Sequence, residues 1–513
     1  MVRLDADAAE PGGADALQIG ALVKMRTHET LAFGMVKSLT MPDYAEAEDD
    51  GKLRVMEIEF VGEGVPGPED GTIVFRRGVS FCPTLGDSVF AVSQDDLMRV
   101  YAQPNVASAK IGTIYQDQTL PAFVSVDDLI GKHFAVLGTT GCGKSCAMAT
   151  MLRAILDQHA EGHVVLLDLH DEYSHAFKDC AELIGGDRLK LPYWMLSSEE
   201  LEEIVVEKSE DEEVDRSILR DSVVHAKRAF NEDDERVNLL GADSPVPYRL
   251  SELIRYLNES LGRLDKPTDS APYLRLINRL TRLTADKRFE FMFEERFTVA
   301  DTMAEILAQL YRVPAQGKPI TVLDLSEVPS DVMKVVISLI CRLTFDFAFW
   351  ANRETPVLLV CEEAHRYANQ LDEDSSYRLI RRALSRIVNE GRKHGVSLGI
   401  VSQRPSELDM GILSQCNTIF AMRMSNLRDQ EFVQGTLSES ALGLTDALPS
   451  LRTGEAVAVG EGVSLPVRVY FDLLPEDQRP RSATAEFSKA WKTSEGLDGY
   501  VDTIVDRWRR QRR

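Results

Sequence analysis

Eight consecutive residues have the types and spacing of a phosphate-binding loop. Residues 138–145 match the pattern G-x-x-x-x-G-K-[ST] at every fixed position. Glycines let backbone N–H groups turn toward phosphate oxygens, because no Cβ blocks that conformation. The Lys144 ammonium would contact the β and γ phosphates, and the Ser145 hydroxyl would bind Mg²⁺. The pattern predicts a site for ATP and Mg²⁺ formed by Gly138, Thr139, Thr140, Gly141, Cys142, Gly143, Lys144 and Ser145.

Two adjacent carboxylates follow a second apolar run, Val357–Cys361. In P-loop enzymes one acid at such a strand end holds Mg²⁺, and a second acid polarises the attacking water. We assign the first role to Glu362 and the second to Glu363. Glu362 stands where Asp is commoner, so we expect a shifted Mg²⁺ geometry. His365 could contact the γ-phosphate, although a structural role is favoured.

These motifs lie at the ends of apolar segments that alternate with helical ones. The segment 133–138 precedes the loop, and the residues after it have helical spacing, which would place phosphates at a helix N-terminus. Near-continuous apolar strands alternating with helices predict an α/β fold with a parallel sheet covered on both faces. The strand candidates are 133–138, 163–169, 319–325, 356–361, 396–402 and 418–424.

The remaining regions of the chain have different hydrophobic patterns. Short alternating segments up to about residue 101 are typical of a small antiparallel barrel. Helical spacing without strand signals between 197 and 316 predicts an inserted helical bundle, whose acidic start is best interpreted as a solvated face. We expect a flexible leader (1–15), a β-barrel (16–125), an ATPase core (126–196 and 317–450), the helical insertion (197–316), and a C-terminal strand pair with a brace or tail (451–513).

The composition is that of a soluble globular protein, with 44% hydrophobic and 27% charged residues. The seven cysteines form no CxxC pair, which argues against a disulfide framework or a zinc site and favours a reducing cytoplasm. The start of the chain has no apolar stretch, and the longest apolar run, 335–351, is interrupted by charges. We therefore expect a cytoplasmic protein with no membrane anchor.

The formal net charge of −24 constrains any contact with DNA. Such acidity argues against non-specific coating of DNA, because the phosphates would be repelled. It does not exclude a ring with an acidic outside and a narrow basic channel.

The set of motifs is completed by three further segments, which are residues 168–173, 390–395 and 402–407. Together with the loop at 138–145 and the acids after 361, they resemble the HerA branch of the HerA/FtsK superfamily, over roughly residues 17–480. The resemblance implies a RecA-like P-loop core with an N-terminal β-barrel, a helical-bundle insertion and a C-terminal brace. It also implies a hexameric, DNA-translocating ATPase.

The resemblance assigns roles to three more residues. Gln403 would be a polar sensor near the γ-phosphate, and Asp168 would lie on the strand beside the P-loop and support the Mg²⁺ shell. Arg392 would be an arginine finger that reaches into a neighbouring subunit, although an interface salt bridge is the alternative. Arg386 is the rival finger. It shares a helical stripe with Arg378 and Arg382. This stripe would be solvated, or in a ring it would line a subunit interface or the channel, with the interface favoured over the channel.

Two classes of function fit these features. The first is an ATP-driven translocase or helicase for double-stranded DNA, which passes through the central channel of a homo-hexamer. The resemblance implies a nuclease or sirtuin-like effector as partner, in DNA end processing or antiviral defence. The alternative is an ATP-dependent scaffold that assembles and activates an effector without moving DNA. A conjugative or secretion ATPase is disfavoured because no membrane segment is evident.

Overall fold

The computed structural model describes most of the chain, and the account below is confined to that part. The described residues are 2–4, 18–27, 30–40, 54–66, 73–84, 86–207, 209–233, 235, 237–263, 270–294, 300–369, 375–437, 442–481, 488, 491 and 500–510. The chain divides into two compact units, residues 1–480 and residues 481–513. The second unit contains helix α17 (Tyr500–Arg510).

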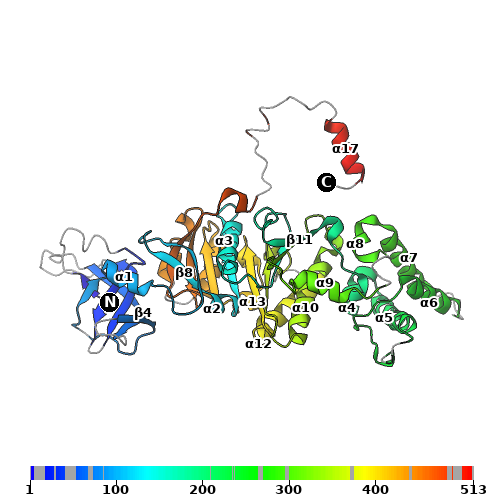
Figure 1. The fold of residues 1–513 in the computed structure, drawn as a ribbon, viewed down its shortest axis with the longest axis horizontal. Helices are drawn as coiled ribbons and strands as arrows, with labels where there is room; N and C mark the ends of the chain where they lie inside the picture. The colour runs from blue at the N-terminus through cyan, green and yellow to red at the C-terminus, as the bar shows by residue number, and fades with distance from the viewer. Residues whose placement is uncertain are drawn as a thin grey trace. The chain divides into compact units, whose positions relative to one another are not determined.

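One mixed sheet of eleven strands forms the centre of the larger unit (Figure 1). Seven neighbouring strands are parallel, and four more continue the sheet in antiparallel fashion. The parallel strands are almost wholly buried, as expected for strands covered on both faces. The order is β11 (Ala181–Gly185), β12 (Ile320–Asp324), β10 (Val164–Asp168), β13 (Val357–Cys361), β14 (Val396–Ser402), β9 (Phe134–Leu137), β15 (Thr418–Met422), β16 (Glu455–Gly460), β17 (Val467–Phe471), β7 (Ser108–Ile114) and β8 (Pro121–Ser125).

This order positions the predicted site. The parallel strands β9, β14 and β13 are neighbours, so their carboxyl ends meet at one edge of the sheet. The P-loop follows β9, Gln403 follows β14, and the two adjacent glutamates follow β13. We call this the carboxyl edge and the opposite one the amino edge. The predicted α/β class is therefore confirmed, and the sheet brings together motifs that lie far apart in the sequence.

A second, antiparallel sheet lies near the N-terminus. Its path is β1 (Val2–Leu4), β4 (Arg54–Pro66), β3 (Leu31–Thr40), β2 (Leu22–Arg26) and β6 (Val89–Ala91), with β5 (Ile73–Arg77) also paired to β4. Residues 2–4 pair with 54–56, so the first residues of the predicted leader belong to this sheet, while 5–15 lie outside the described residues. Closure of the sheet into a barrel stays a prediction.

The predicted end of the barrel at residue 125 is wrong. Strands β7 and β8 belong to the central sheet, where β7 pairs with β17. Helix α1 (Gln94–Val100), which begins with a capping box of Ser93 and Asp96, separates them from the N-terminal sheet. Alternating buried positions occur in barrels and in edge strands alike, so the sequence pattern could not distinguish the two.

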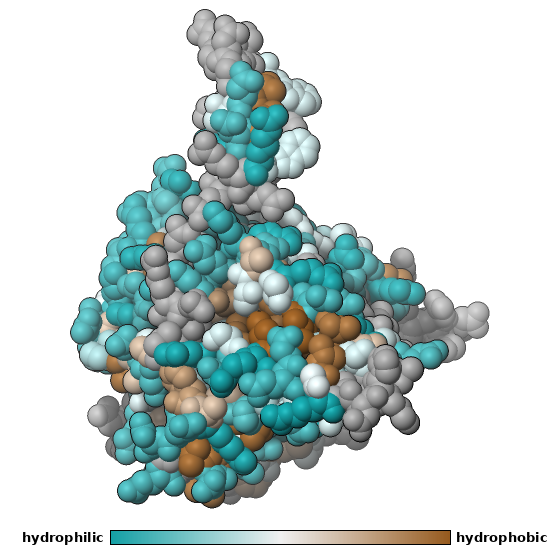
Figure 2. All heavy atoms as spheres, turned by 90° about the vertical axis from the view of Figure 1, so that its right-hand side faces the viewer, coloured by the Kyte–Doolittle hydropathy of each residue, from teal (hydrophilic) through white to brown (hydrophobic). Residues whose placement is uncertain are grey.

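Between residues 197 and 316 the described residues form helices and no strand. The helices are α4 (Ser198–Val205), α5 (Glu212–Phe230), α6 (Leu250–Gly262), α7 (Ala271–Ala285), α8 (Glu290–Phe293) and α9 (Met303–Tyr311). Helix α4 packs on the core helix α10 (Ser330–Trp350), and α9 packs on β12, so the ends of this region are part of the core packing. Figure 2 views the molecule from the right-hand side of Figure 1. On this face, hydrophobic residues gather in the middle of a hydrophilic surface.

The C-terminal strand pair is an extension of the core. Strand β16 pairs antiparallel with β15, and β17 continues toward β7, so the predicted boundary at 450/451 falls inside one sheet. Within the described part of the chain, no helix is long and apolar enough to span a membrane.

Candidate active site

The P-loop has the backbone geometry that its glycines predict. It connects β9 to helix α3 (Lys144–Leu156), and Gly141 and Gly143 have φ angles of 76° and 102°. Residues with a Cβ are strained in this left-handed region. A Cβ on Gly138 would lie 2.8 Å from the Cys142 sulfur. The Lys144 Nζ donates to the Thr139 carbonyl at 3.3 Å, which holds the ammonium over the loop.

The two predicted carboxylates are buried at the end of β13. Glu362 is 1% exposed, and burial raises its pKa to about 8, although a hydrogen bond from the Tyr173 hydroxyl at 2.6 Å lowers it. Glu363 is 8% exposed and has a left-handed φ of 49°, which is strained for a glutamate. Burial also raises the pKa of Glu363, against the opposing Lys144 charge. Strained backbone of this kind is concentrated at functional sites.

One oxygen of Glu363 receives no hydrogen bond from the described residues. This oxygen, Oε2, is buried, and the His365 Nδ1 lies 3.2 Å from it. The same ring nitrogen lies 3.3 Å from the Ser402 hydroxyl, and burial lowers the His365 pKa to about 4. His365 is therefore neutral near pH 7, and its ring contacts the Glu363 carboxylate and the Ser402 hydroxyl. Such contacts fit the favoured structural role.

Gln403 lies between the P-loop and Glu363. Its Oε1 accepts a hydrogen bond from the Thr140 hydroxyl, and its side chain also hydrogen-bonds Glu363. A cavity of about 380 Å³ opens beside it, lined by Thr139, Thr140, Gln403, Arg404, Ser406, Glu407, Asn426 and Asp429. This placement is what a sensor of the γ-phosphate requires.

Asp168 does not lie where we expected it. Its strand, β10, neighbours β12 and β13, so β13 and β14 separate it from the P-loop strand. The buried carboxylate accepts backbone N–H bonds from His170, Glu172 and Tyr173 at 3.2, 3.1 and 2.8 Å. Burial raises the Asp168 pKa to about 6. Asp168 thus fixes the loop that follows β10 and acts on the site through that loop.

That loop delivers two side chains that the sequence interpretation missed. The Ser145 hydroxyl donates to the Glu172 Oε2 at 2.6 Å, and the Tyr173 hydroxyl donates to Glu362. The two acceptors, Glu172 and Glu362, are the carboxylates that we expect around the Mg²⁺. The signal was present in the segment Asp168–Tyr173, which follows a buried strand at the same sheet edge as the P-loop.

The residues present fit Mg²⁺ bound together with nucleotide. No group of three His, Cys, Asp or Glu side chains in the described residues could hold a metal alone. Mg²⁺ typically keeps one or two protein ligands, with phosphate oxygens and waters completing its shell. Ser145 and Glu362 would be those ligands, and Mg²⁺ would neutralise phosphate charge there. Glu172 and Tyr173 would orient the two ligands.

Removing the Tyr173 hydroxyl should weaken the metal site selectively. For Tyr173→Phe we expect the Mg²⁺ concentration at half-maximal ATPase rate to rise about tenfold, because partners of metal ligands contribute 10–100-fold to affinity. Tyr367→Phe is the matched control, since that buried hydroxyl donates to the Glu362 backbone carbonyl at 2.9 Å. Equal Mg²⁺ requirements in the two variants would contradict the role of Tyr173.

Comparison with known proteins identifies the family. Residues 109–344 match the family model described as Helicase HerA, central domain. The chain is 28% identical over 519 residues to the DNA double-strand break repair helicase HerA of Pyrococcus furiosus, covering 93% of this chain and 86% of that protein. These matches support HerA family membership. The predicted resemblance is confirmed, and the chain is an ATP-hydrolysing P-loop enzyme.

Two further relatives and one solved structure are also similar to this chain. The DNA double-strand break repair helicase HerA of Saccharolobus solfataricus is 26% identical, with 76% of this chain and 73% of that protein covered. A probable helicase of Methanocaldococcus jannaschii is 24% identical, with 89% and 87% covered. The structure of VirB4 of Thermoanaerobacter pseudethanolicus has a TM-score of 0.55 at 15% identity, covering 74% of this chain and 99% of that one, which shows a shared fold.

Arg392 is far from the P-loop of its own chain. It is exposed at the start of helix α12 (Arg392–His394), which precedes β14 and therefore lies at the amino edge. Gln403 marks the other end of β14, and a seven-residue strand spans roughly 20 Å. An arginine side chain cannot bridge that distance. Within one chain, Arg392 and the nucleotide site are separate.

The rival finger, Arg386, is engaged within its own chain. Its Nη1 lies 3.0 Å from the Asp346 carboxylate, and its guanidinium lies 3.9 Å from the centre of the Phe345 ring. Of the two arginines named from the sequence, Arg392 is therefore the better placed to reach another molecule.

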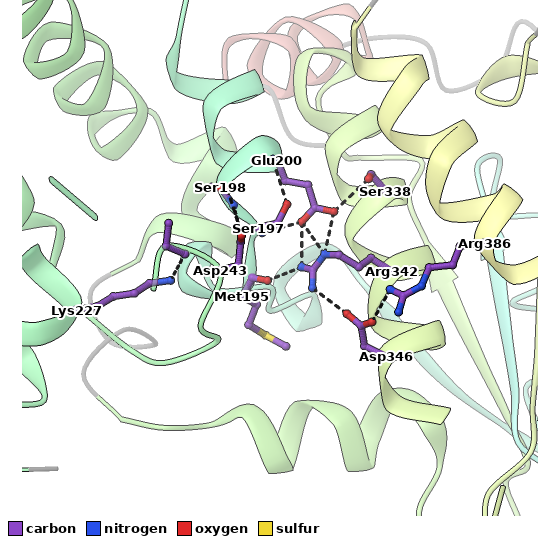
Figure 3. Close-up of polar contacts among 11 residues, drawn as sticks. Met195, Ser197, Ser198, Glu200, Lys227, Asp243, Ser338, Arg342, Asp346 and Arg386 are labelled. Carbon is purple, nitrogen blue, oxygen red and sulfur yellow. Dashed lines mark hydrogen bonds and ion pairs between the residues drawn. The ribbon is translucent and has the colours of Figure 1, made fainter. Parts of the chain in front are cut away.

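Asp346 links Arg386 to a larger polar network (Figure 3). Arg342 on α10 contacts the buried Glu200 of α4 at 2.9 Å and donates to the Met195 carbonyl at 2.6 Å. Ser338 donates to the same carboxylate at 3.1 Å. The network ties the first helix of the insertion to α10 and to α11 (Ser375–Arg386), the helix that leads toward Arg392.

Breaking this network should destabilise the folded core of the chain. Arg342→Met leaves the Glu200 carboxylate buried without its cation, and such changes typically cost about 3–5 kcal/mol of unfolding free energy. The double change Glu200→Met with Arg342→Met removes both charges and should recover most of the loss. Thermal or denaturant unfolding measures both, and a double variant less stable than Arg342→Met would contradict the account.

Proposed function

We propose that this chain is the motor subunit of a hexameric ring that uses ATP to move double-stranded DNA through its central channel. The ring is supported by one observation: the length of β14 separates Arg392 from the nucleotide site of its own chain. An arginine finger so placed can serve only the site of a neighbouring copy. DNA as substrate is supported by relatives named DNA double-strand break repair helicase.

The chemistry of hydrolysis follows from the site. Lys144 and the P-loop backbone would bind the phosphates, and Ser145 with Glu362 would hold Mg²⁺, which would neutralise phosphate charge. The Oε2 of Glu363, which receives no hydrogen bond from the described residues, would accept one from the attacking water and polarise it. Gln403 joins Glu363 to the P-loop and senses the γ-phosphate. Arg392 of the neighbouring copy stabilises the charge that develops in the transition state.

Contact with DNA should be electrostatic and local. With a net charge of −24, only a locally basic channel lining can approach the phosphates. Binding should therefore be salt-dependent and nearly independent of base sequence. We also propose that the ring works with a nuclease or other effector, such as a sirtuin-like protein, in DNA end processing or antiviral defence.

DNA-dependent ATP turnover tests the proposed function. We expect duplex DNA to raise the ATPase rate several-fold at low salt, and added salt to remove the increase, because cations compete at the phosphates. The measurement is steady-state hydrolysis with and without long duplex, at two salt concentrations. Hydrolysis indifferent to DNA, with and without a partner, would instead favour the ATP-dependent scaffold.

A further inference from the structure

Helix α10 ends in two exposed aromatic side chains. Phe349 is 42% exposed and Trp350 is 82% exposed. Their rings are perpendicular, with centroids 5.3 Å apart, and the His394 ring lies 5.0 Å from Phe349. Large apolar groups that gather on a surface commonly mark an interaction site, because leaving them in water is unfavourable. We call Phe349, Trp350 and His394 the aromatic patch.

The patch is fixed to the segment that carries Arg392. The turn after α10 has Asn352 and Arg353 at left-handed φ angles of 51° and 70°. The Arg353 Nε donates to the Lys393 carbonyl at 2.6 Å, which joins this turn to α12. Two strained residues held in place by a neighbouring element indicate a defined surface. The aromatic patch and Arg392 are therefore presented together at the amino edge.

We propose that the aromatic patch is the apolar anchor by which one copy of this chain docks on the carboxyl edge of a second copy. The proposal rests on the proposed function, because Arg392 must meet the second copy's nucleotide site. A patch on the same rigid segment then lies inside the same interface. Exposed tryptophans at the centre of interfaces typically contribute most of the binding energy.

Charge supports a second copy as the occupant. The amino edge presents three exposed cations, and two acids, Glu354 and Glu390, lie beside them. This edge is nearly neutral, so copies that carry −24 each can approach there with less repulsion. The cavity at the carboxyl edge is lined by two carboxylates, Glu407 and Asp429, and by Arg404, which pairs with Glu407. This leaves one negative charge in excess at the cavity. Two different faces give a head-to-tail contact, and such contacts form a ring where the rotation between copies closes. The cations are Arg353, Arg392 and Lys393.

The test compares two equally exposed apolar residues. Trp350→Ala and Leu239→Ala each truncate a side chain that is 82% exposed, and Leu239 belongs to the helical insertion. The mass of the full chain is measured in solution with ATP and Mg²⁺, together with ATPase activity per subunit. We expect Trp350→Ala to shift assemblies to single chains and to lower activity at least tenfold at low protein concentration. Leu239→Ala should resemble the wild type, and Trp350→Phe should retain most of the assembly.

The outcomes separate this proposal from the proposed function. Unchanged thermal unfolding in Trp350→Ala, with activity restored at high protein concentration, supports the docking role. Assembly equal to the wild type overturns it. So does reduced affinity for a labelled DNA duplex with assembly unchanged, which makes the patch a DNA contact. An Arg392→Ala variant that keeps full activity removes the trans finger, and the mass measurement on Trp350→Ala still decides the docking role of the patch.

Discussion

Glu363→Gln should bind ATP normally and hydrolyse it at least a hundredfold more slowly than the wild type. The amide has nearly the shape of the carboxylate, but it cannot polarise the attacking water as a base, and this role contributes 10²–10⁴-fold. The phosphate contacts of Lys144 and the P-loop are untouched, so nucleotide affinity should be preserved. Single-turnover hydrolysis and the binding of a fluorescent ATP analogue measure the two properties separately.

A second carboxylate of the same cavity provides the control for Glu363. Glu407→Gln alters a residue that lines the cavity and pairs with Arg404 at 2.7 Å. It should change the rate by less than about threefold, because exposed pairs contribute little. If Glu363→Gln turns over ATP close to the wild-type rate, the base must be Glu362 or His365.

Arg392→Ala should lower ATP turnover about a thousandfold or more, the range measured for arginine fingers that act in trans. Binding of ATP should change little, because the residue lies at the amino edge of its own sheet. Arg255→Ala removes an exposed cation of the helical insertion and is the control, with a rate near that of the wild type. Steady-state kinetics should therefore show a loss in kcat with little change in nucleotide affinity. Equal effects of the two substitutions would indicate a general loss of positive charge.

The positions of the P-loop and of the two glutamates could be predicted from the sequence because the expected phosphate chemistry sets their residue types and spacing. Gly141 and Gly143 adopt the left-handed conformations that only glycine adopts without strain, and both glutamates are buried at a strand end. Gln403 also lies at the predicted edge. These positions follow from local pattern and from the rule that parallel strands share their carboxyl ends.

Strand order could not be predicted, and the failed interpretation of Asp168 follows from that. The sequence gives strand ends, but the order β10–β13–β14–β9 depends on tertiary packing. Asp168 therefore caps the loop behind the site, and its neighbours Glu172 and Tyr173 reach the ligands. Strands β7 and β8 were assigned to the barrel for the same reason, since β7 pairs with β17, which lies far along the chain.

The central claim is that each nucleotide site is completed by Arg392 of the next copy, and mixing two inactive variants tests it most directly. Lys144→Ala chains cannot hold phosphate but retain Arg392, whereas Arg392→Ala chains retain an intact P-loop. The measurement is ATP hydrolysis across mixing ratios, with co-assembly of the two variants verified by mass. We predict that mixtures recover part of the wild-type rate, with a maximum near equal proportions. Mixed assemblies that stay as inactive as either variant alone would contradict a site completed in trans.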